Sequence, residues 1–212
     1  MTAFDETAAS ADELWQWAVE EYENPSPVVR LLLDRFFATV GGAFQLLGPS
    51  DRVLEVGCGP AMSSRRLHAM LGGRPFEISD VDVRYIARLK ETGFFLPVRQ
   101  ESVLALQRET DSFDCVLLLE VLEHVKEYER ALSELVRVSR GYIVVSVPRE
   151  PIWRMLNMAR GKYMRQGGNT PGHVNHWSTR GIATLVGRFA DVISVSTPLP
   201  WSVVVARVPR KA

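Results

Sequence analysis

The stretch "DRVLEVGCGPAMSSRRL", residues 51–67, decides how the rest of this 212-residue sequence is interpreted. An apolar run at residues 53–56 is followed by Gly57 and Gly59, and then by a segment that can start a helix. Glycine adopts positive φ without a steric penalty and lets the backbone approach a ligand closely. The stretch therefore predicts a buried strand, a tight turn and a helix, with the turn available to bind a ligand.

Working outward from this unit, short β-branched runs alternate with segments of helical periodicity. The predicted strands are residues 52–56, 75–79, 94–98, 114–119, 142–147, 192–197 and 201–208. Alternation of strand and helix is typical of a parallel sheet covered on both faces. Only "PLP" separates the last two strands, which leaves no room for a crossover helix. We therefore expect an α/β fold: a doubly wound, mostly parallel seven-stranded sheet with an antiparallel hairpin at one edge.

The bulk composition fits a single globular domain, with 46% hydrophobic and 24% charged residues. No apolar run is long enough for a membrane span, and the acidic start "MTAFDETAASADEL" does not resemble a signal peptide. Cys58 and Cys115 both lie in apolar contexts and do not form a disulfide framework. We therefore expect a cytoplasmic location.

The predicted domain spans residues 1–212 and has four parts. These are a helical cap at 1–49, a ligand-binding core at 50–148, an insert at 149–180, and a last helix with the edge hairpin at 181–212. The net charge of zero conceals an asymmetry, because residues 137–212 carry 12 Lys or Arg and only two acidic residues. This indicates either an anionic substrate or surface near the C-terminal part, or charges that neutralise one another across the fold.

The glycine turn favours some ligands over others. A dinucleotide fingerprint would need glycine at position 62, which is Met62, so a bound pyrophosphate is disfavoured. Glu55 instead suggests a ligand with an amino group. Asp80 ends the second predicted strand, 23 residues beyond Gly57, where an acid can accept both hydroxyls of a ribose. Asp82 suits the N-cap of the next helix.

Four motifs in this order resemble those of class I S-adenosylmethionine-dependent methyltransferases: "VLEVGCGPA", "SDVDVRYIARL", "DSFDCVLLLEVLEHV" and "YIVVSVP". The resemblance covers roughly residues 50–208 and implies S-adenosylmethionine as the cofactor. The cofactor-binding residues that it implies are Glu55, Gly57, Gly59, Asp80, Val81, Ser102, Val103 and Leu119. The sequence departs from the family at the third glycine, which is Ala61, and at the adenine-binding acid, where Ser102 follows Glu101.

The segment after the fourth strand carries a second group of polar residues. Glu120, Glu123 and His124 are spaced i, i+3, i+4, so on a helical turn they would share one face. Two carboxylates and an imidazole form half of a divalent-metal site. The loop "PGHVNHWST", residues 171–179, supplies His173 and His176 as further candidates.

This pattern resembles a metal-assisted subset of the family that includes quinone-biosynthesis O-methyltransferases and small-RNA 2′-O-methyltransferases. The residues that match the subset are Glu120, Glu123, His124 and His176, and they imply a divalent metal that activates the acceptor oxygen. Two alternatives stay open. His124 or His176 is a catalytic general base without metal, or the Glu and His side chains cap a helix and bond to backbone.

The insert at 149–180 mixes six Lys or Arg residues with Trp, Tyr and Met. This composition suits an anionic, partly apolar or lipid-linked acceptor, or an interfacial surface; the alternative is a lid helix that buries its Met and Trp side chains. We expect O-methylation of a small-molecule hydroxyl, as in secondary metabolism. RNA 2′-O-methylation and a non-catalytic cofactor-binding protein are the alternatives, and zero net charge argues against nucleic acid. Peripheral membrane contact and a homodimer stay open.

Overall fold

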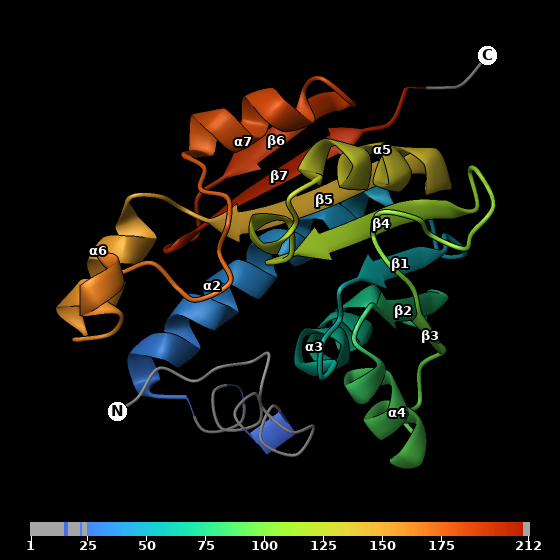
Figure 1. The fold of residues 1–212 in the computed structure, drawn as a ribbon. Helices are drawn as coiled ribbons and strands as arrows, with labels where there is room; N and C mark the ends of the chain where they lie inside the picture. Colours follow the sequence, from blue (N-terminus) through green and yellow to red (C-terminus); the bar gives the residue numbers. More distant parts are fainter. Residues whose placement is uncertain (1–14, 17–21, 23–24, 210–212) are drawn as a thin grey trace.

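The computed structural model describes residues 15–16, 22 and 25–209, and a seven-stranded sheet organises them (Figure 1). The strand order is β3-β2-β1-β4-β5-β7-β6. The strands are β1 (Val53–Val56), β2 (Phe76–Asp80), β3 (Val98–Gln100), β4 (Phe113–Leu119), β5 (Ser139–Pro148), β6 (Asp191–Ser196) and β7 (Trp201–Arg207). The predicted helix at residues 13–22 lies mostly outside the described residues.

The five strands from β1 to β5 are parallel, and β7 runs antiparallel to both of its neighbours, β5 and β6. The predicted seven-stranded, mostly parallel sheet with an antiparallel edge pair is therefore confirmed. The short link after β6 returns the chain at once, and β7 inserts between β5 and β6.

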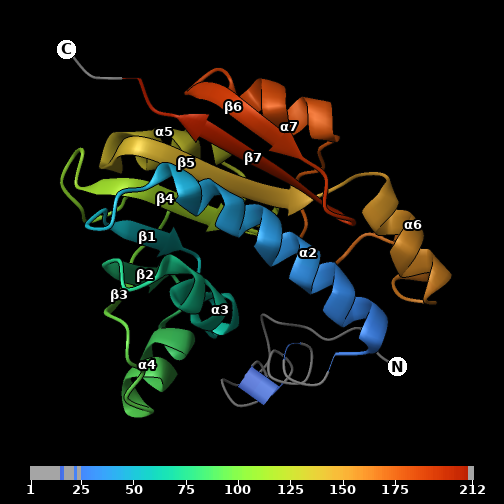
Figure 2. The same cartoon turned by 180° about the vertical axis from the view of Figure 1, so that it is seen from behind.

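Helices cover both faces of the sheet (Figures 1 and 2). The α-helices are α2 (Pro27–Ala43), α3 (Met62–Leu71), α4 (Val83–Glu91), α5 (Tyr128–Val138), α6 (Ile152–Ala159) and α7 (Thr179–Val186). The 3₁₀ turns are η1 (Phe44–Leu46), η2 (Leu122–His124) and η3 (Met164–Gln166). No helix among these described residues is long and apolar enough to cross a membrane.

Two hydrophobic cores result, one on each face of the sheet. Leucines of α2, α3 and α4, such as Leu33, Leu67 and Leu89, pack on one face. Leu132 and Leu135 of α5 and Ile182 of α7 pack on the other. Both β1 and β4 are consequently buried on both faces, which explains why residues 115–119 of β4 form a continuous hydrophobic run rather than an alternating one.

Strand β3 begins four residues later than the predicted strand at 94–98. The N–H of Phe94 donates to the carbonyl of Leu89 at 2.9 Å, so this residue completes the end of α4. Pairing with β2 starts only at Val98, which lies opposite Ile78. The apolar pair Phe94 and Phe95 was mistaken for strand because aromatic residues favour strands.

Strands β4 and β5 approach closely at Gly141. A Cβ at this position would lie 2.4 Å from the carbonyl oxygen of Asp114, which is backbone and cannot swing away. Gly42, in α2, is the opposite case, because a Cβ there would meet nothing within 4 Å.

We predict that Gly141→Ala lowers the free energy of unfolding by about 1–3 kcal/mol, because the strands must separate to admit the methyl group. The matched variant Gly42→Ala should raise it by about 0.5–1 kcal/mol, since alanine favours the helix. Urea denaturation followed by circular dichroism measures both changes. Equal stability of the two variants would contradict this packing of β4 on β5.

Candidate functional site

The glycine turn after β1 is held against the end of β2. The N–H groups of Gly57 and Cys58 both donate to the carbonyl of Ser79, at 2.7 and 3.0 Å. Gly57 has φ +79°, and a Cβ there would lie 2.3 Å from Cγ2 of Val121, in the segment after β4. Gly59 has φ +51°, and a Cβ there would meet nothing within 4 Å. The turn is therefore packed on one side and open on the other, as a ligand cradle requires.

Ala61, which replaces the third glycine of the motif, keeps the left-handed backbone that glycine would favour. Its φ is +61°, and it forms the N-cap of α3. An alanine in this region costs of order 1 kcal/mol, a strain that the surrounding packing must hold. The substitution therefore leaves the path of the turn unchanged.

Glu55 joins the turn to α3. Its side chain is buried, and its carboxylate accepts hydrogen bonds from the hydroxyls of Ser63 at 2.7 Å and Ser64 at 2.5 Å. Burial raises the pKa of Glu55 to about 7, although both serine hydroxyls oppose the shift. Both carboxylate oxygens are thus engaged within the protein, and the geometry gives Glu55 a positioning role beneath the turn.

Asp80 ties the ends of β1 and β2 together. Its Oδ2 accepts the N–H of Gly59 at 2.7 Å, and its Oδ1 accepts the N–H of Asp82 at 2.8 Å. Burial raises the pKa of Asp80, and the backbone donors oppose this shift. Each carboxylate oxygen can accept a second hydrogen bond, so the side chain can still receive ribose hydroxyls. Val81 beside it is 64% exposed and available for a ligand to cover.

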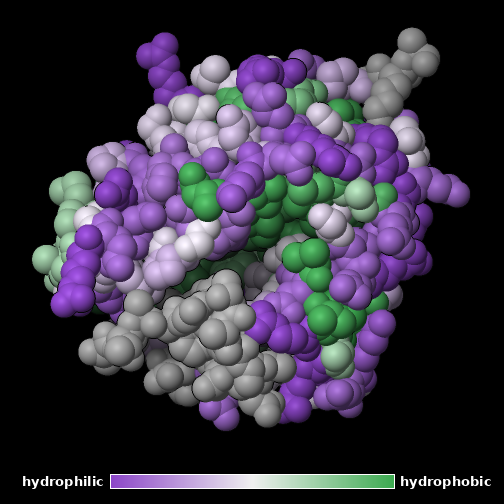
Figure 3. All heavy atoms as spheres, in the orientation of Figure 1, coloured by the Kyte–Doolittle hydropathy of each residue, from purple (hydrophilic) through white to green (hydrophobic). Residues whose placement is uncertain are grey.

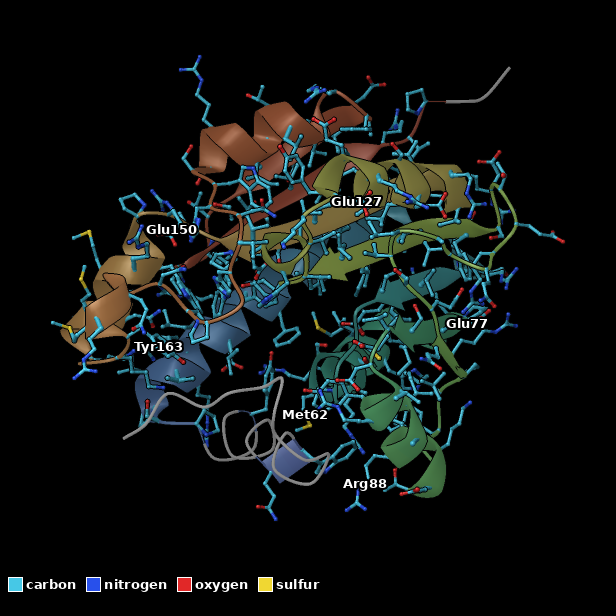
Figure 4. The ribbon with its side chains drawn as sticks, viewed as in Figure 1. Met62, Glu77, Arg88, Glu127, Glu150 and Tyr163 are labelled. Atoms are coloured by element: carbon cyan, nitrogen blue, oxygen red, sulfur yellow. The ribbon has the colours of Figure 1, made fainter. Side chains whose placement is uncertain are left out.

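The structure separates the roles of Glu101 and Ser102 after β3. The Glu101 carboxylate is buried and accepts hydrogen bonds from Nε of Arg108 at 2.8 Å and from the N–H of Gln107 at 2.9 Å. Its Oε1 also lies 2.7 Å from Nη2 of Arg108 in an ion pair. Arg108 also donates to Glu77 on β2 at 2.6 Å. Figure 4 shows Glu77 on the opposite side of the molecule from α6. Glu101 is therefore part of a structural ion-pair network, whereas Ser102 is half-buried and its hydroxyl accepts the N–H of Leu104 at 3.2 Å.

Glu120 and Glu123 do not share one helical face, because Glu120 leaves β4 with a left-handed φ of +57°. Its carboxylate accepts the hydroxyl of Ser146 on β5 at 2.7 Å, and the side chain of Trp201 is a second donor. Burial raises the pKa of Glu120 to about 8. Glu120 is therefore directed toward β5 and β7 and is satisfied there.

Glu123 lies in η2 with 2% of its surface exposed. Its Oε2 has no hydrogen-bond partner among the described residues. Burial and the nearby charge of Glu120 raise the pKa of Glu123 well above its usual value. A buried carboxylate oxygen without a donor is costly, so its presence indicates that a cation, proton or ligand completes the site.

The neighbouring His124 has a defined tautomer. Its Nδ1 lies 3.1 Å from the carbonyl oxygen of Gly172, so Nδ1–H donates and Nε2 keeps its lone pair. Burial lowers the pKa of His124, which favours the neutral ring. This is the form of imidazole that binds a metal or accepts a proton.

His173 completes this cluster because its loop is fastened to η2. The N–H groups of Val174 and Asn175 donate to the carbonyl of Glu123 at 2.9 and 3.1 Å. The rings of His124 and His173 lie edge to face with centroids 4.8 Å apart. One ligand atom from each of Glu123, His124 and His173 lies within 4.8 Å of the others. Burial lowers the pKa of His173 to about 3, so this ring is neutral too.

His176, predicted as a fourth member of the metal set, is directed elsewhere. It is exposed, and its Nε2 lies 2.7 Å from Oδ1 of Asn169. The structure thus brings two of the four predicted metal residues, Glu123 and His124, together with His173. Glu120 and His176 lie outside the three-residue cluster.

Aromatic side chains surround the cluster. The ring of Trp153 is stacked over His173 at 6.2 Å, and its Nε1 donates to Thr170. Trp201 packs on Phe36 at 4.8 Å and lies 6.3 Å from Trp153. Figure 3 shows the face of the molecule drawn in Figure 1 hollowed near its middle, with apolar atoms lining the hollow. Polar groups at the strand ends are thus set among apolar walls, which is typical of small-molecule sites.

Comparisons with known proteins identify the class. Residues 54–145 match a protein-family model described as a methyltransferase domain. A SAM-dependent methyltransferase from Aquifex aeolicus superposes with a TM-score of 0.66 at 17% identity, covering 95% of this chain and 100% of that one. A search of curated proteins finds no significant match.

Two further solved structures share the fold. The magnesium protoporphyrin IX methyltransferase of Synechocystis, solved with bound S-adenosylhomocysteine, gives a TM-score of 0.63 at 15% identity, covering 98% and 100% of the two chains. A chain from a complex of the Haloferax volcanii Trm112 methyltransferase activator with its methyltransferase gives 0.67 at 13% identity, covering 96% and 99%. At such identities, these likenesses establish the fold alone.

Residues 54–145 are thus a methyltransferase domain, and the whole chain has the fold of solved S-adenosylmethionine-dependent methyltransferases. The chain is accordingly an enzyme of methyl transfer, and the domain match supports S-adenosylmethionine as its methyl donor. The resemblance stated from the four sequence motifs is thereby confirmed.

Sequence reasoning missed several residues of this site. Ser146 and Trp201 come from β5 and β7, and no local motif marks them, whereas Trp153 of α6 belongs to the insert that the sequence assigned to the acceptor. Arg108 likewise gave no signal, because its partner Glu101 is recognised only once the loop is folded. His173 was visible in the sequence, but its advantage over His176 depends on the backbone bonds to Glu123.

We predict that Asp80→Ala weakens binding of S-adenosylhomocysteine at least about tenfold, because a charged hydrogen-bond acceptor is lost from both the turn and the ribose site. Isothermal titration calorimetry measures the change. The control is Asp82→Ala, which removes the side-chain cap of Arg84 N–H. It should cost about 1 kcal/mol of stability and leave the affinity within about threefold of wild type. Equal losses of affinity in both variants would contradict the role given to Asp80.

Proposed function

We propose that this methyltransferase transfers the methyl group to a hydroxyl oxygen of a small molecule, with a divalent cation held by Glu123, His124 and His173. The observation that carries the proposal is the buried Glu123 carboxylate. Its Oε2 lacks a donor among the described residues, and one of its oxygens lies within 4.8 Å of a ring nitrogen of both His124 and His173. Carboxylate oxygen and imidazole nitrogen together suit Mg²⁺, Mn²⁺ or Zn²⁺.

The cofactor half of the proposed site is the edge formed by β1, β2 and β3. Gly57 and Gly59 would approach the methionine part, Asp80 the ribose, and Ser102 the adenine. The remaining residues assigned to this half are Val81, Val103 and Leu119. Glu55 would act beneath them by holding the turn through Ser63 and Ser64.

The acceptor half adjoins the cofactor half, because β1 and β4 are paired neighbours. Val56 lies opposite Leu118, so the turn after β1 and the segment after β4 emerge side by side. Methyl transfer is an in-line displacement, and its rate depends on how well the acceptor oxygen is held against the sulfonium. Trp153, Trp201 and Phe36 would exclude water and bind the apolar part of the acceptor.

A bound cation would lower the pKa of the acceptor hydroxyl and so make the oxygen nucleophilic at neutral pH. The protein's own contribution is to keep both imidazoles neutral and to fix their orientation. Gly172 orients His124, and the loop bonds to Glu123 place His173. Without a cation, His124 would instead accept the hydroxyl proton at Nε2.

We predict that Mn²⁺ added to the protein saturated with S-adenosylhomocysteine raises the melting temperature. A ligand of the folded state at one hundred times its Kd stabilises by about 2.7 kcal/mol, or roughly 5–10 °C for a chain of this size. Glu123→Gln and His173→Ala should each abolish this metal-dependent step. His176→Ala is the control and should retain it, because His176 bonds to Asn169.

The outcomes separate the two mechanisms. A metal step that survives in Glu123→Gln and His173→Ala but vanishes in His176→Ala would contradict the assigned ligands. If S-adenosylhomocysteine raises the melting temperature of the wild type but Mn²⁺ raises it no further, the metal-assisted mechanism is overturned and His124 remains as the direct base. Transfer of radiolabelled methyl to phenols and alcohols, compared with amines and thiols, would test the hydroxyl assignment.

A further inference from the structure

Residues 152–168, which contain α6 and η3, form a protrusion that projects from the sheet at the end away from β3 (Figures 1 and 2). We call this segment the α6 protrusion. It is a folded unit rather than a loose loop. Asn157 is 1% exposed, and its Nδ2 donates to the carbonyl of Gly168 at 2.9 Å, while its own carbonyl accepts the N–H of Lys162 at 2.8 Å. These bonds fix the backbone from which the outer side chains of the protrusion project.

The methionines of the α6 protrusion face outward. Met155 is 59% exposed, Met164 is 60% exposed and Met158 is 37% exposed. In Figure 4 the sulfur atoms at this end of the molecule lie along its outer edge and point away from the sheet. A lid helix would have buried these side chains, but Asn157 and Trp153 occupy the inward positions instead. The alternative prediction of a lid helix that buries its methionine side chains is therefore wrong for the methionines.

The charge of this region has a single sign. Residues 151–190 contain six Lys or Arg residues and no Asp or Glu. Arg160, Lys162 and Arg165 are exposed on the protrusion, and none forms an ion pair with a carboxylate of the described residues. Figure 3 shows apolar and hydrophilic atoms next to each other at this end of the molecule. Exposed flexible apolar side chains and uncompensated positive charges are thus combined on one projecting unit.

We propose that the α6 protrusion docks on the surface of an anionic lipid bilayer. Its methionines would enter the boundary between headgroups and acyl chains, and its basic side chains would contact the anionic headgroups. A nucleic acid fits the protrusion less well, because its most exposed apolar side chains are methionines and not aromatic rings that stack on bases. Trp153 at the base of the protrusion packs on His173, so docking would turn this end of the candidate site toward the bilayer.

The test is vesicle flotation of the full-length protein with phosphatidylcholine vesicles that contain or lack one quarter phosphatidylglycerol. We expect binding only to the anionic vesicles, and at least about tenfold weaker partitioning in Lys162→Glu/Arg165→Glu. The matched control is Arg180→Glu/Arg188→Glu, with Arg180 on α7 and Arg188 just after it. It changes the net charge equally and should partition like wild type. The apolar variant Met155→Ser/Met164→Ser should also partition less, without any change of charge.

Equal partitioning of wild type and Lys162→Glu/Arg165→Glu would overturn the proposal, as would equal losses in the two charge-reversal variants. Binding to single-stranded RNA that is stronger than binding to anionic vesicles would overturn it in favour of a nucleic-acid surface. The melting-temperature shift with S-adenosylhomocysteine, measured for every variant, verifies the fold. If a charge-reversal variant no longer shows this melting-temperature shift, it is misfolded. The variant Met155→Ser/Met164→Ser, which leaves all charges in place, then tests whether the protrusion binds the vesicles.

Discussion

The contact between Gly57 and Val121 is the constraint on which the site depends. β1 and β4 are adjacent parallel strands, so the turn after one and the segment after the other must emerge at the same edge. The absence of a Cβ at Gly57 lets the two segments touch, since a methyl group would lie 2.3 Å from Val121. This contact fixes the separation between the cofactor turn and the cluster in η2. A reaction that needs in-line geometry requires such a fixed separation.

The edge of the sheet at which β1, β2 and β4 end also gathers four carboxylates, and most of their oxygens accept hydrogen bonds from nearby donors. Glu55 is satisfied by two serine hydroxyls, Asp80 by two backbone N–H groups, and Glu120 by Ser146 and Trp201. Glu123 is the member of this group with an oxygen that no described donor meets. Because the first three carboxylates have donors inside the protein and this oxygen has none, the comparison supports the proposal that Glu123 binds a ligand.

Local signals in the sequence predicted most of the fold. Helix α4 begins at Val83, inside the quoted motif "SDVDVRYIARL", because Asp82 caps its start through the N–H of Arg84 at 2.8 Å, as the sequence predicted. The edge hairpin followed from a link too short for a helix. The third strand was predicted too early, which shows the limit of such signals. Phe94 is a residue type that favours strands, but its N–H donates to Leu89 at the end of α4.

The site was predictable only where its residues are close in the sequence. Glu123 and His124 lie next to each other, whereas His173 is selected by backbone bonds that span about fifty residues. Long-range bonds of this kind leave no local pattern. The exposure of Met155 and Met164 was hidden for a similar reason, because it depends on Asn157 occupying the buried position of α6.

The most direct test of the account is the anomalous diffraction of a crystal grown with S-adenosylhomocysteine and Mn²⁺. The account predicts the cofactor product along the glycine turn at Gly57 and Gly59, and one strong manganese peak bounded by Glu123, His124 and His173. A manganese peak at His176 and Glu120 instead, or a filled cofactor site with no peak in η2, would contradict it.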